Sequence, residues 1–312
     1  MSEKKQKLER MSLGDLRKYY EDFLASLSDK RPETRGTYQR ALREFLRWFP
    51  GEDSFRFQVD DVERYKSYLT KTRNLSDVSV STYLTALRRF CEYLVNVGVL
   101  IANPARHVDG NKRPVTHSRE SLSQADVQRL LDSVEKTDSR GLRDYAVIKL
   151  MLGCALSEIE IIRADVADLQ YHDGKSVLFV QGKGRKEKDE FVVLQDDSRK
   201  VIDQYLRTRT NPFPQAPLFA SAGNRTKGLR MSTRGIRERV TFYLESAGIK
   251  RGRLRKLTPY SLRHTAALMM ADAGATAEEI RQRMRLGSIA TAMLYLNERN
   301  RRSTESNNGL CV

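Results

Sequence analysis

Three side chains suited to phosphate chemistry stand in the second half of the chain. Arg263 lies in Thr-Pro-Tyr-Ser-Leu-Arg-His-Thr-Ala (258–266), and Tyr295 follows 32 positions later in an apolar helical stretch. Lys183 stands between two glycines. A guanidinium is a fixed pair of donors that matches two oxygens of a phosphate. Transesterification at a phosphodiester needs such cations, together with a nucleophile and an acid for the leaving oxygen.

Taken singly, these residues have ordinary explanations. Tyr295 is one of 13 tyrosines and by itself would be expected in a core. A lysine between two glycines usually marks the charged tip of a hairpin. Their order along the chain, however, resembles the C-terminal signature of the tyrosine recombinase (phage integrase) family. The resemblance covers roughly residues 12–300.

The resemblance implies a role for each residue. Tyr295 would attack DNA and form a 3′-phosphotyrosyl ester, Arg263 would hold the scissile phosphate, and Lys183 would protonate the leaving 5′-oxygen. Because the ester stores the energy of the broken bond, no cofactor and no metal is expected. His264, next to Arg263, is expected to hydrogen-bond within the fold instead of acting as the acid.

Three positions depart from the family pattern. Ala155, in Gly-Cys-Ala-Leu-Ser-Glu (153–158), stands where the family has its first arginine. Tyr260 replaces a histidine or lysine, and Leu286 replaces a histidine or tryptophan. Losing one preorganised donor lowers the rate roughly 10²–10³-fold. Either another cation has taken its place, or the protein binds DNA without cleaving it efficiently. The candidate cations nearby in sequence are Arg163, Arg283 and Arg285.

The first hundred residues predict a helical bundle. Apolar residues recur at helical spacing in four stretches between Ser12 and Gly98. The fourth stretch carries Arg88 and Arg89 and resembles the core-binding, SAM-like domain of the same family, which implies that this helix lies against DNA. An ordinary exposed helix face is the alternative for each of these arginines.

A linker and a second domain follow. Residues 104–120 contain two prolines and no periodicity, so they predict an interdomain linker, to which Lys112 and Arg113 give positive charge. Short apolar runs at 176–180 and 190–194 predict a hairpin around Lys183. The expected fold is mainly α, with a four-helix core-binding domain (12–103) and an α-rich catalytic-type domain (121–312) that carries a small antiparallel sheet.

The charge of the chain favours a polyanionic partner. Its net charge is +16, and residues 225–256 hold eleven basic and two acidic residues, among them the candidate DNA-binding residues Arg230 and Arg234. The family resemblance implies double-stranded DNA as the partner and a tetramer on DNA, with a paralogous recombinase as a possible companion. Three cysteines without zinc or redox spacing, and no apolar run of about 18 residues, favour a cytoplasmic protein without a membrane span.

Three functions remain open from the sequence. The first is a site-specific recombinase or integrase of a mobile element. The second is a catalytically impaired relative that binds specific DNA as an accessory or architectural subunit. The third, a basic helical transcription regulator unrelated to strand transfer, is disfavoured by the ordered set of Lys183, Arg263 and Tyr295.

Overall fold

A computed structural model describes residues 12–30, 32–49, 57–110, 120–182, 185–210, 212–223, 226–250 and 256–308. The chain divides into two compact units, 1–114 and 115–312. This division falls within the segment for which the sequence predicts a linker. Lys112 and Arg113 lie outside the described residues.

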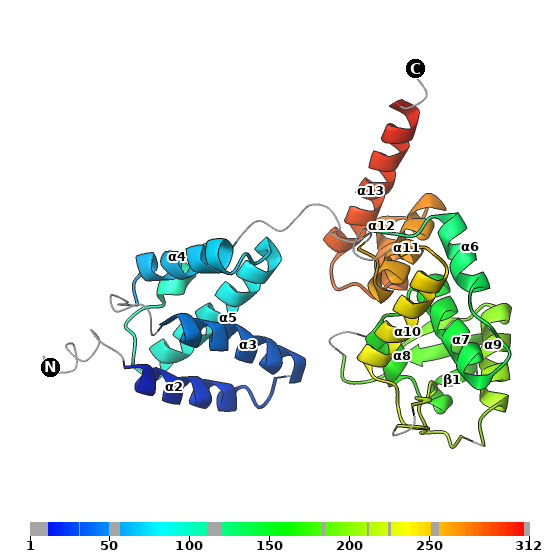
Figure 1. Cartoon of the computed structure of the whole chain (residues 1–312), viewed down its shortest axis with the longest axis horizontal. Helices are drawn as coiled ribbons and strands as arrows, with labels where there is room; N and C mark the ends of the chain where they lie inside the picture. The colour runs from blue at the N-terminus through cyan, green and yellow to red at the C-terminus, as the bar shows by residue number, and fades with distance from the viewer. Residues whose placement is uncertain are drawn as a thin grey trace, which may run out of the picture. The chain divides into compact units, whose positions relative to one another are not determined.

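Where the structure describes it, the N-terminal unit consists of four α-helices (Figure 1) around an aromatic core, which confirms the predicted bundle. Its elements are α2 (Leu13–Ser26), α3 (Pro32–Trp48), α4 (Val59–Ser67) with the π-helical turn η2 (Tyr68–Thr72), α5 (Asp77–Asn96) and the 3₁₀ turn η3 (Pro104–Arg106). Ser12 and Ser76 cap α2 and α5 by accepting hydrogen bonds from backbone N–H groups three residues on. The ring of Phe45 packs edge-on against Tyr65, with centroids 5.1 Å apart.

The start of the predicted linker belongs to this unit. Ala105 and Val108 are fully buried in its core. Arg88 on α5 donates from Nε to the Ala105 carbonyl at 2.9 Å and from Nη2 to the Val108 carbonyl at 2.6 Å. The prediction of a linker from residue 104 was therefore wrong for 104–108, because apolar side chains and an arginine fasten that stretch to the bundle.

The C-terminal unit is α-rich with one small sheet, as the sequence predicts. Its elements are α6 (Gln124–Asp132), α7 (Ser139–Gly153), α8 (Glu158–Arg163), η4 (Val166–Asp168), β1 (Leu169–His172), β2 (Lys175–Val180), β3 (Glu190–Val193), α9 (Asp196–Arg207), α10 (Thr233–Ser246), α11 (Pro259–Asp272), α12 (Ala277–Arg283) and α13 (Ile289–Asn308). None of the described helices is long and apolar enough to cross a membrane.

The sheet has three antiparallel strands in the order β1-β2-β3. The predicted hairpin is β2 and β3, with Leu178 opposite Val192. The sequence reading missed β1. Asp173 and Gly174 join β1 to β2 with φ of 48° and 72°, the left-handed pair that a two-residue hairpin turn requires.

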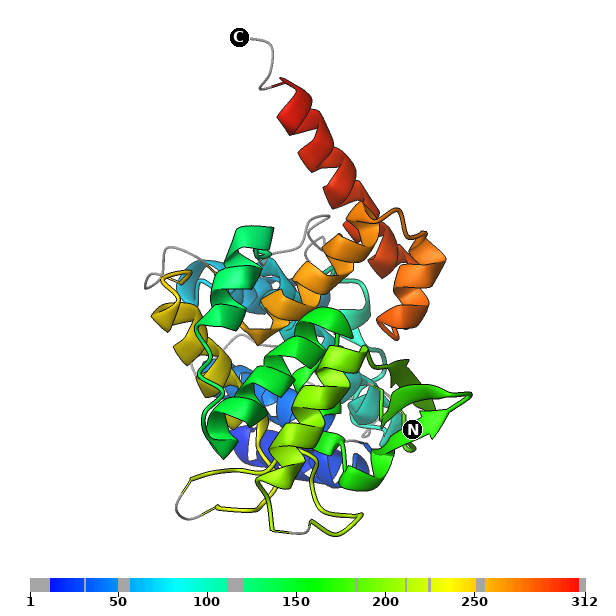
Figure 2. The same ribbon diagram turned by 90° about the vertical axis from the view of Figure 1, so that its right-hand side faces the viewer.

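Helix α7 runs through the middle of this unit and packs against α9 and α11; α7 and α9 lie side by side in Figure 2. Its fifteen residues span roughly 22 Å, since a helix rises 1.5 Å per residue. The N-terminal end is capped by Asp138, and the C-terminal end leads into Ala155. Helices α12 and α13 pack together, α13 also packs on α11, and the second half of α13 extends away from the unit (Figure 1).

Candidate active site

The signature motif forms the start of helix α11. Pro259 occupies the first turn, and Thr258 and Ser261 form a capping box that fixes where the helix begins. This start places Tyr260 on an exposed face, whereas Arg263 and His264 point into the unit and are 8% and 2% exposed. One helix terminus therefore positions three of the residues that the sequence singled out.

Arg263 is held by groups from two other segments. Its Nη1 donates to the Ala155 carbonyl at 2.5 Å and to Glu160 Oε2 at 2.8 Å, and its Nη2 donates to the Met284 carbonyl. Burial lowers the pKa of Arg263, and the nearby charge of Glu160 opposes that shift. The guanidinium thus lies at the C-terminal end of α7, next to Ala155, the position where the resemblance implies an arginine.

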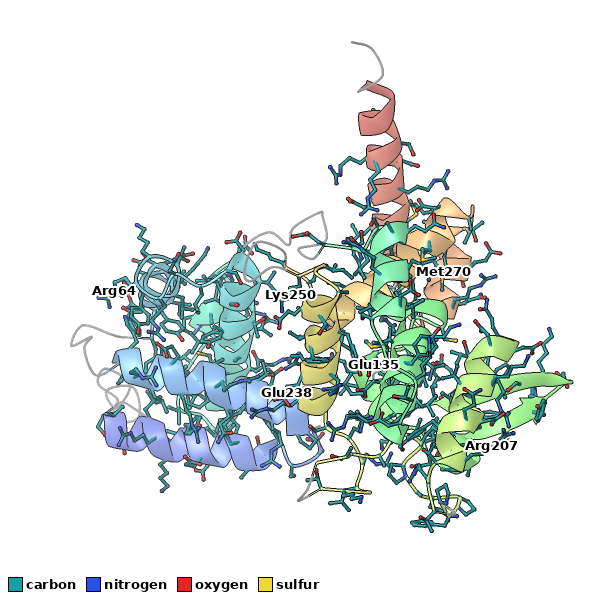
Figure 3. All side chains as sticks on the ribbon, turned by 45° about the vertical axis from the view of Figure 1, so that its right-hand side comes forward. Arg64, Glu135, Arg207, Glu238, Lys250 and Met270 are labelled. Atoms are coloured by element: carbon teal, nitrogen blue, oxygen red, sulfur yellow. The ribbon has the colours of Figure 1, made fainter. Side chains whose placement is uncertain are left out.

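A second arginine reaches the same place from the turn between α12 and α13. Arg285 donates from Nε to Glu160 Oε1 at 2.5 Å, from Nη2 to the Ala155 carbonyl at 3.2 Å and from Nη1 to the Arg283 carbonyl at 2.6 Å. Its side chain is 5% exposed. It borders a cavity of about 380 Å³ that is also lined by Cys154 and by Met270, which is labelled in Figure 3.

Glu160 joins the two arginines. Its carboxylate also accepts the backbone N–H and the hydroxyl of Ser157, as the capping box at the start of α8. Burial by itself raises the pKa of Glu160, but the hydrogen bond from Arg285 and the charges of Arg263 and Arg285 outweigh it and lower the pKa. Two guanidiniums and one carboxylate leave this cluster with a net positive charge.

Tyr295 lies beside this cluster in a small apolar core. It is 0% exposed on α13 and packs in the same cluster as Ala155 and Met284, with Leu286 at its edge. Burial raises the pKa of its phenol, and the charge and hydrogen bond of Tyr260 raise it further, while the charge of Arg263 lowers it. The ring of His264 stands 5.3 Å from the ring of Tyr295, centroid to centroid.

The structure therefore brings Arg263 and Tyr295 together, with Ala155, Tyr260 and Leu286, the three positions that the sequence analysis reads as departures from the family pattern, around them. Lys183 lies outside the described residues. The sequence reading missed Glu160, although the Ser157-x-x-Glu160 spacing of a capping box was visible in the sequence.

The predicted DNA-binding arginines differ in their surroundings. Arg88 is bound within the bundle, whereas its neighbour Arg89 is exposed. Arg230 donates to the carbonyls of Ile162 and Ala164 and pairs with Asp165. Arg234 is exposed and pairs with Glu238 at 2.7 Å, so its charge faces solvent.

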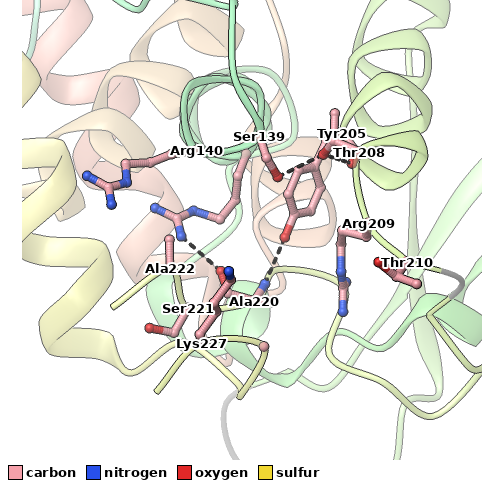
Figure 4. Close-up of a pocket in the computed structure, with 12 residues that line it drawn as sticks. Ser139, Arg140, Tyr205, Thr208, Arg209, Thr210, Ala220, Ser221, Ala222 and Lys227 are labelled. Carbon is pink, nitrogen blue, oxygen red and sulfur yellow. Dashed lines mark hydrogen bonds between the residues drawn. The ribbon is translucent and has the colours of Figure 1, made fainter. Parts of the chain in front are cut away.

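A second cationic feature lies at the opposite end of α7. A pocket of about 480 Å³, shown in Figure 4, is lined by Arg140, Arg143, Arg209 and Lys227 together with several hydroxyl groups, and none of the described residues that line it carries a carboxylate. Arg143 is buried and pairs with Asp144, while Arg140 and Lys227 are exposed. This surface suits an anion, at roughly one length of α7 from Ala155.

Comparisons with known proteins identify the family of this chain. The family model of the phage integrase family matches residues 120–302, and the model of the phage integrase N-terminal SAM-like domain matches residues 16–99. Tyrosine recombinase XerC of Leptospira interrogans (serovar copenhageni) is 27% identical over 290 residues, covering 92% of this chain and 89% of the relative. Tyrosine recombinase XerC of Escherichia coli O127:H6 is 28% identical over 290 residues, covering 91% and 92%.

Solved structures share the fold. XerH site-specific recombinase bound to palindromic difH substrate, a post-cleavage complex, aligns with a TM-score of 0.73 and 17% identity, covering 96% of this chain and 84% of that one. The Tn1549 transposon integrase in complex with a circular intermediate DNA aligns with a TM-score of 0.69 and 16% identity, covering 93% and 98%. With a family match that spans more than half of its residues, this chain belongs to the phage integrase family, the tyrosine recombinases.

Proposed function

We propose that the protein is a site-specific DNA recombinase that cleaves one strand of double-stranded DNA through Tyr295. The observation that carries this proposal is the proximity of nucleophile and cation: Tyr295 packs in one small cluster with Ala155 and Met284, and the carbonyls of both residues accept hydrogen bonds from Arg263. A phosphate held by Arg263 would thus lie within reach of Tyr295.

The reaction keeps the number of phosphoester bonds constant. The Tyr295 oxygen forms a bond to phosphorus, the bond to the 5′-oxygen breaks, and the phenolic proton leaves. The leaving 5′-oxygen takes a proton, a role that the family resemblance assigns to Lys183. Attack by a 5′-hydroxyl on the phosphotyrosyl ester reverses these steps and rejoins a strand, with no net change in the number of ester bonds.

Relatives and charge support DNA as the partner. The XerH and Tn1549 integrase structures are complexes with DNA, and the net charge of +16 suits a polyanion. Because recombination exchanges strands between two duplexes, four tyrosines have to act, so we propose a tetramer on DNA. The Tn1549 integrase belongs to a transposon, which favours a mobile element as the source of the substrate.

A second candidate function is specific DNA binding without cleavage. Glu160 neutralises part of the positive charge beside Arg263, Tyr295 is fully buried, and Ala155 has no donor. An accessory or architectural subunit would tolerate all three features.

A nicked suicide duplex that carries the recombination site separates the two functions, because cleavage traps the protein on DNA as a covalent adduct. The proposal expects an adduct that Tyr295→Phe abolishes. Tyr171→Phe is the matched control, since Tyr171 is 69% exposed on β1 in the same unit. Firm, salt-sensitive binding with no adduct would overturn cleavage and favour the accessory function.

A further inference from the structure

The alanine at position 155 leaves the family site one guanidinium short, and a guanidinium from another segment lies at that place. We propose that Arg285, in the turn between α12 and α13, supplies the phosphate-binding group that residue 155 lacks. This inference rests on the proposed cleavage through Tyr295 and names a residue that completes the same site.

The geometry sets the two arginines side by side. Arg263 and Arg285 both donate to the Ala155 carbonyl, at 2.5 Å and 3.2 Å, and each binds a different oxygen of Glu160. Two guanidiniums that donate hydrogen bonds to the two oxygens of one carboxylate are arranged as they would be around two oxygens of one phosphate. Glu160 thus holds both side chains in the orientation that phosphate binding needs.

The turn that carries Arg285 is built to direct the side chain inward. Arg285 has a φ of 53°, a left-handed conformation that a residue with a β-carbon adopts only when its surroundings impose it. Its N–H donates to the Gln282 carbonyl at 2.9 Å, and the next N–H, of Leu286, donates to the Arg281 carbonyl at 2.8 Å. These bonds hold the turn in the conformation that buries the guanidinium.

Donors remain for a phosphate. A guanidinium has five N–H groups, and three from each arginine are used by the partners described above. Among the described residues no partner is bound to the Nε hydrogen or to one Nη2 hydrogen of Arg263, or to one hydrogen on each Nη of Arg285. The two cations share one carboxylate, so an incoming anion meets a net positive charge in a poorly solvated site, where its attraction is strong.

Arg285 fits this role better than the other cations near it in sequence. Arg283 is exposed and offers Arg285 only its carbonyl oxygen. Arg163 is half-buried at the end of α8 and is not among the side chains bound to Glu160 in the described part of the chain. Ala155 is fully buried, so a long side chain at 155 and the guanidinium of Arg285 would compete for the same volume.

Moving the arginine tests the inference. The rate of adduct formation on the nicked suicide duplex is measured for the unaltered protein, Arg285→Ala, Ala155→Arg and the double variant Ala155→Arg/Arg285→Ala. Loss of one preorganised donor predicts a rate about 10²–10³-fold lower for Arg285→Ala. The double variant restores a guanidinium at the same place, so its rate of adduct formation should be at least about tenfold higher than that of Arg285→Ala. Ala155→Arg alone places two arginines in one volume, so it should not gain in the same way.

Controls separate chemistry from folding and binding. Arg283→Ala removes an exposed arginine two residues away and should leave the rate within about threefold. Arg285→Lys keeps a charge beside Glu160 but not the two-pronged donor, so it should lower the melting temperature less than Arg285→Ala does and still cleave slowly. The affinity for uncleaved duplex should fall far less than the cleavage rate in all variants, because Arg285 is one phosphate contact among many in binding but a preorganised donor in the transition state.

Each result decides a different point. Full activity of Arg285→Ala would overturn the inference, and so would a folded double variant no faster than Arg285→Ala, since Arg285 would then serve only to hold the turn. An inactive unaltered protein together with an active double variant would also overturn it, while leaving cleavage through Tyr295 intact. No adduct from any of the proteins would overturn the proposed cleavage itself, and the role of Arg285 with it.

Discussion

Replacing Glu160 by glutamine should destabilise the C-terminal unit more than any surface change of the same size. The substitution keeps the shape of the side chain and an acceptor for Ser157, but it leaves Arg263 and Arg285 buried without a counter-charge. Removing one partner of a buried ion pair costs about 3–5 kcal/mol of unfolding free energy. For a unit of this size each kcal/mol lowers the melting temperature by roughly 2–4 °C, so we expect a drop of about 6–20 °C.

Glu158→Gln is the matched control for this measurement. Glu158 lies two residues earlier on the same helix, is 21% exposed and contacts Arg237 at 3.5 Å. A surface pair of this kind contributes at most about 1 kcal/mol, so its loss should lower the melting temperature by no more than about 4 °C. Differential scanning calorimetry of the full chain at pH 7 measures both variants.

The effect of pH gives the same prediction a second test. The pKa of Glu160 is lowered in the folded protein, so its charge stabilises the fold above the pKa of the unfolded chain and ceases to do so as pH falls through the folded value. The gap in melting temperature between the unaltered protein and Glu160→Gln should therefore be full at pH 7 and narrow below about pH 4. Equal melting temperatures at pH 7, or a gap that does not depend on pH, would refute the charged cluster described here.

Two further predictions concern DNA binding. Arg88→Ala should lower the unfolding free energy of the N-terminal unit by about 2 kcal/mol, because two carbonyls lose a charged donor, whereas Arg89→Ala should weaken DNA binding and leave the melting temperature unchanged. If Arg140 and Lys227 each neutralise one DNA phosphate, the pair of substitutions Arg140→Gln and Lys227→Gln should reduce the slope of log affinity against log salt by about 1.8. The charge-matched control changes two exposed residues of α9 to glutamine, Lys200 and Arg207, of which Arg207 is labelled in Figure 3. An equal loss of slope in that control would show that the pocket has no special part in DNA binding.

The fold was predictable where hydrophobic period and capping signals agree. The four apolar stretches between 12 and 98 became the four helices of the bundle, and the Ser123-x-x-Asp126 spacing became a capping box at the start of α6. The strand β1 was missed because it is only four residues long and three of its four side chains are exposed. Only the Asp173-Gly174 turn signalled it, and a turn signal is informative only when both flanking strands are considered.

The site was predictable only where its residues keep a fixed spacing within one motif. Arg263 and Tyr295 could be named because their order and separation are those of the family. Arg285 could be named only as one of three candidate cations, and Glu160 not at all, because the two residues are 125 positions apart and meet only through tertiary packing. No local pattern around either residue states that the other is its partner.

A substitution in a motif therefore shows that one side chain is missing from the sequence. It does not show that the corresponding charge is missing from the folded site. Ala155 removes the donor from the end of α7, yet its carbonyl is bound by a guanidinium from the turn before α13. The stabilisation of a phosphate in the transition state depends on the positions of the hydrogen-bond donors, and not on which segment of the chain carries them. For this reason the decisive comparison is between Arg285→Ala and the double variant that moves the arginine back to position 155. If the rate of adduct formation falls in Arg285→Ala and recovers in the double variant, the site was rebuilt with an arginine from another segment. If the double variant is no faster than Arg285→Ala, Ala155 marks a true loss.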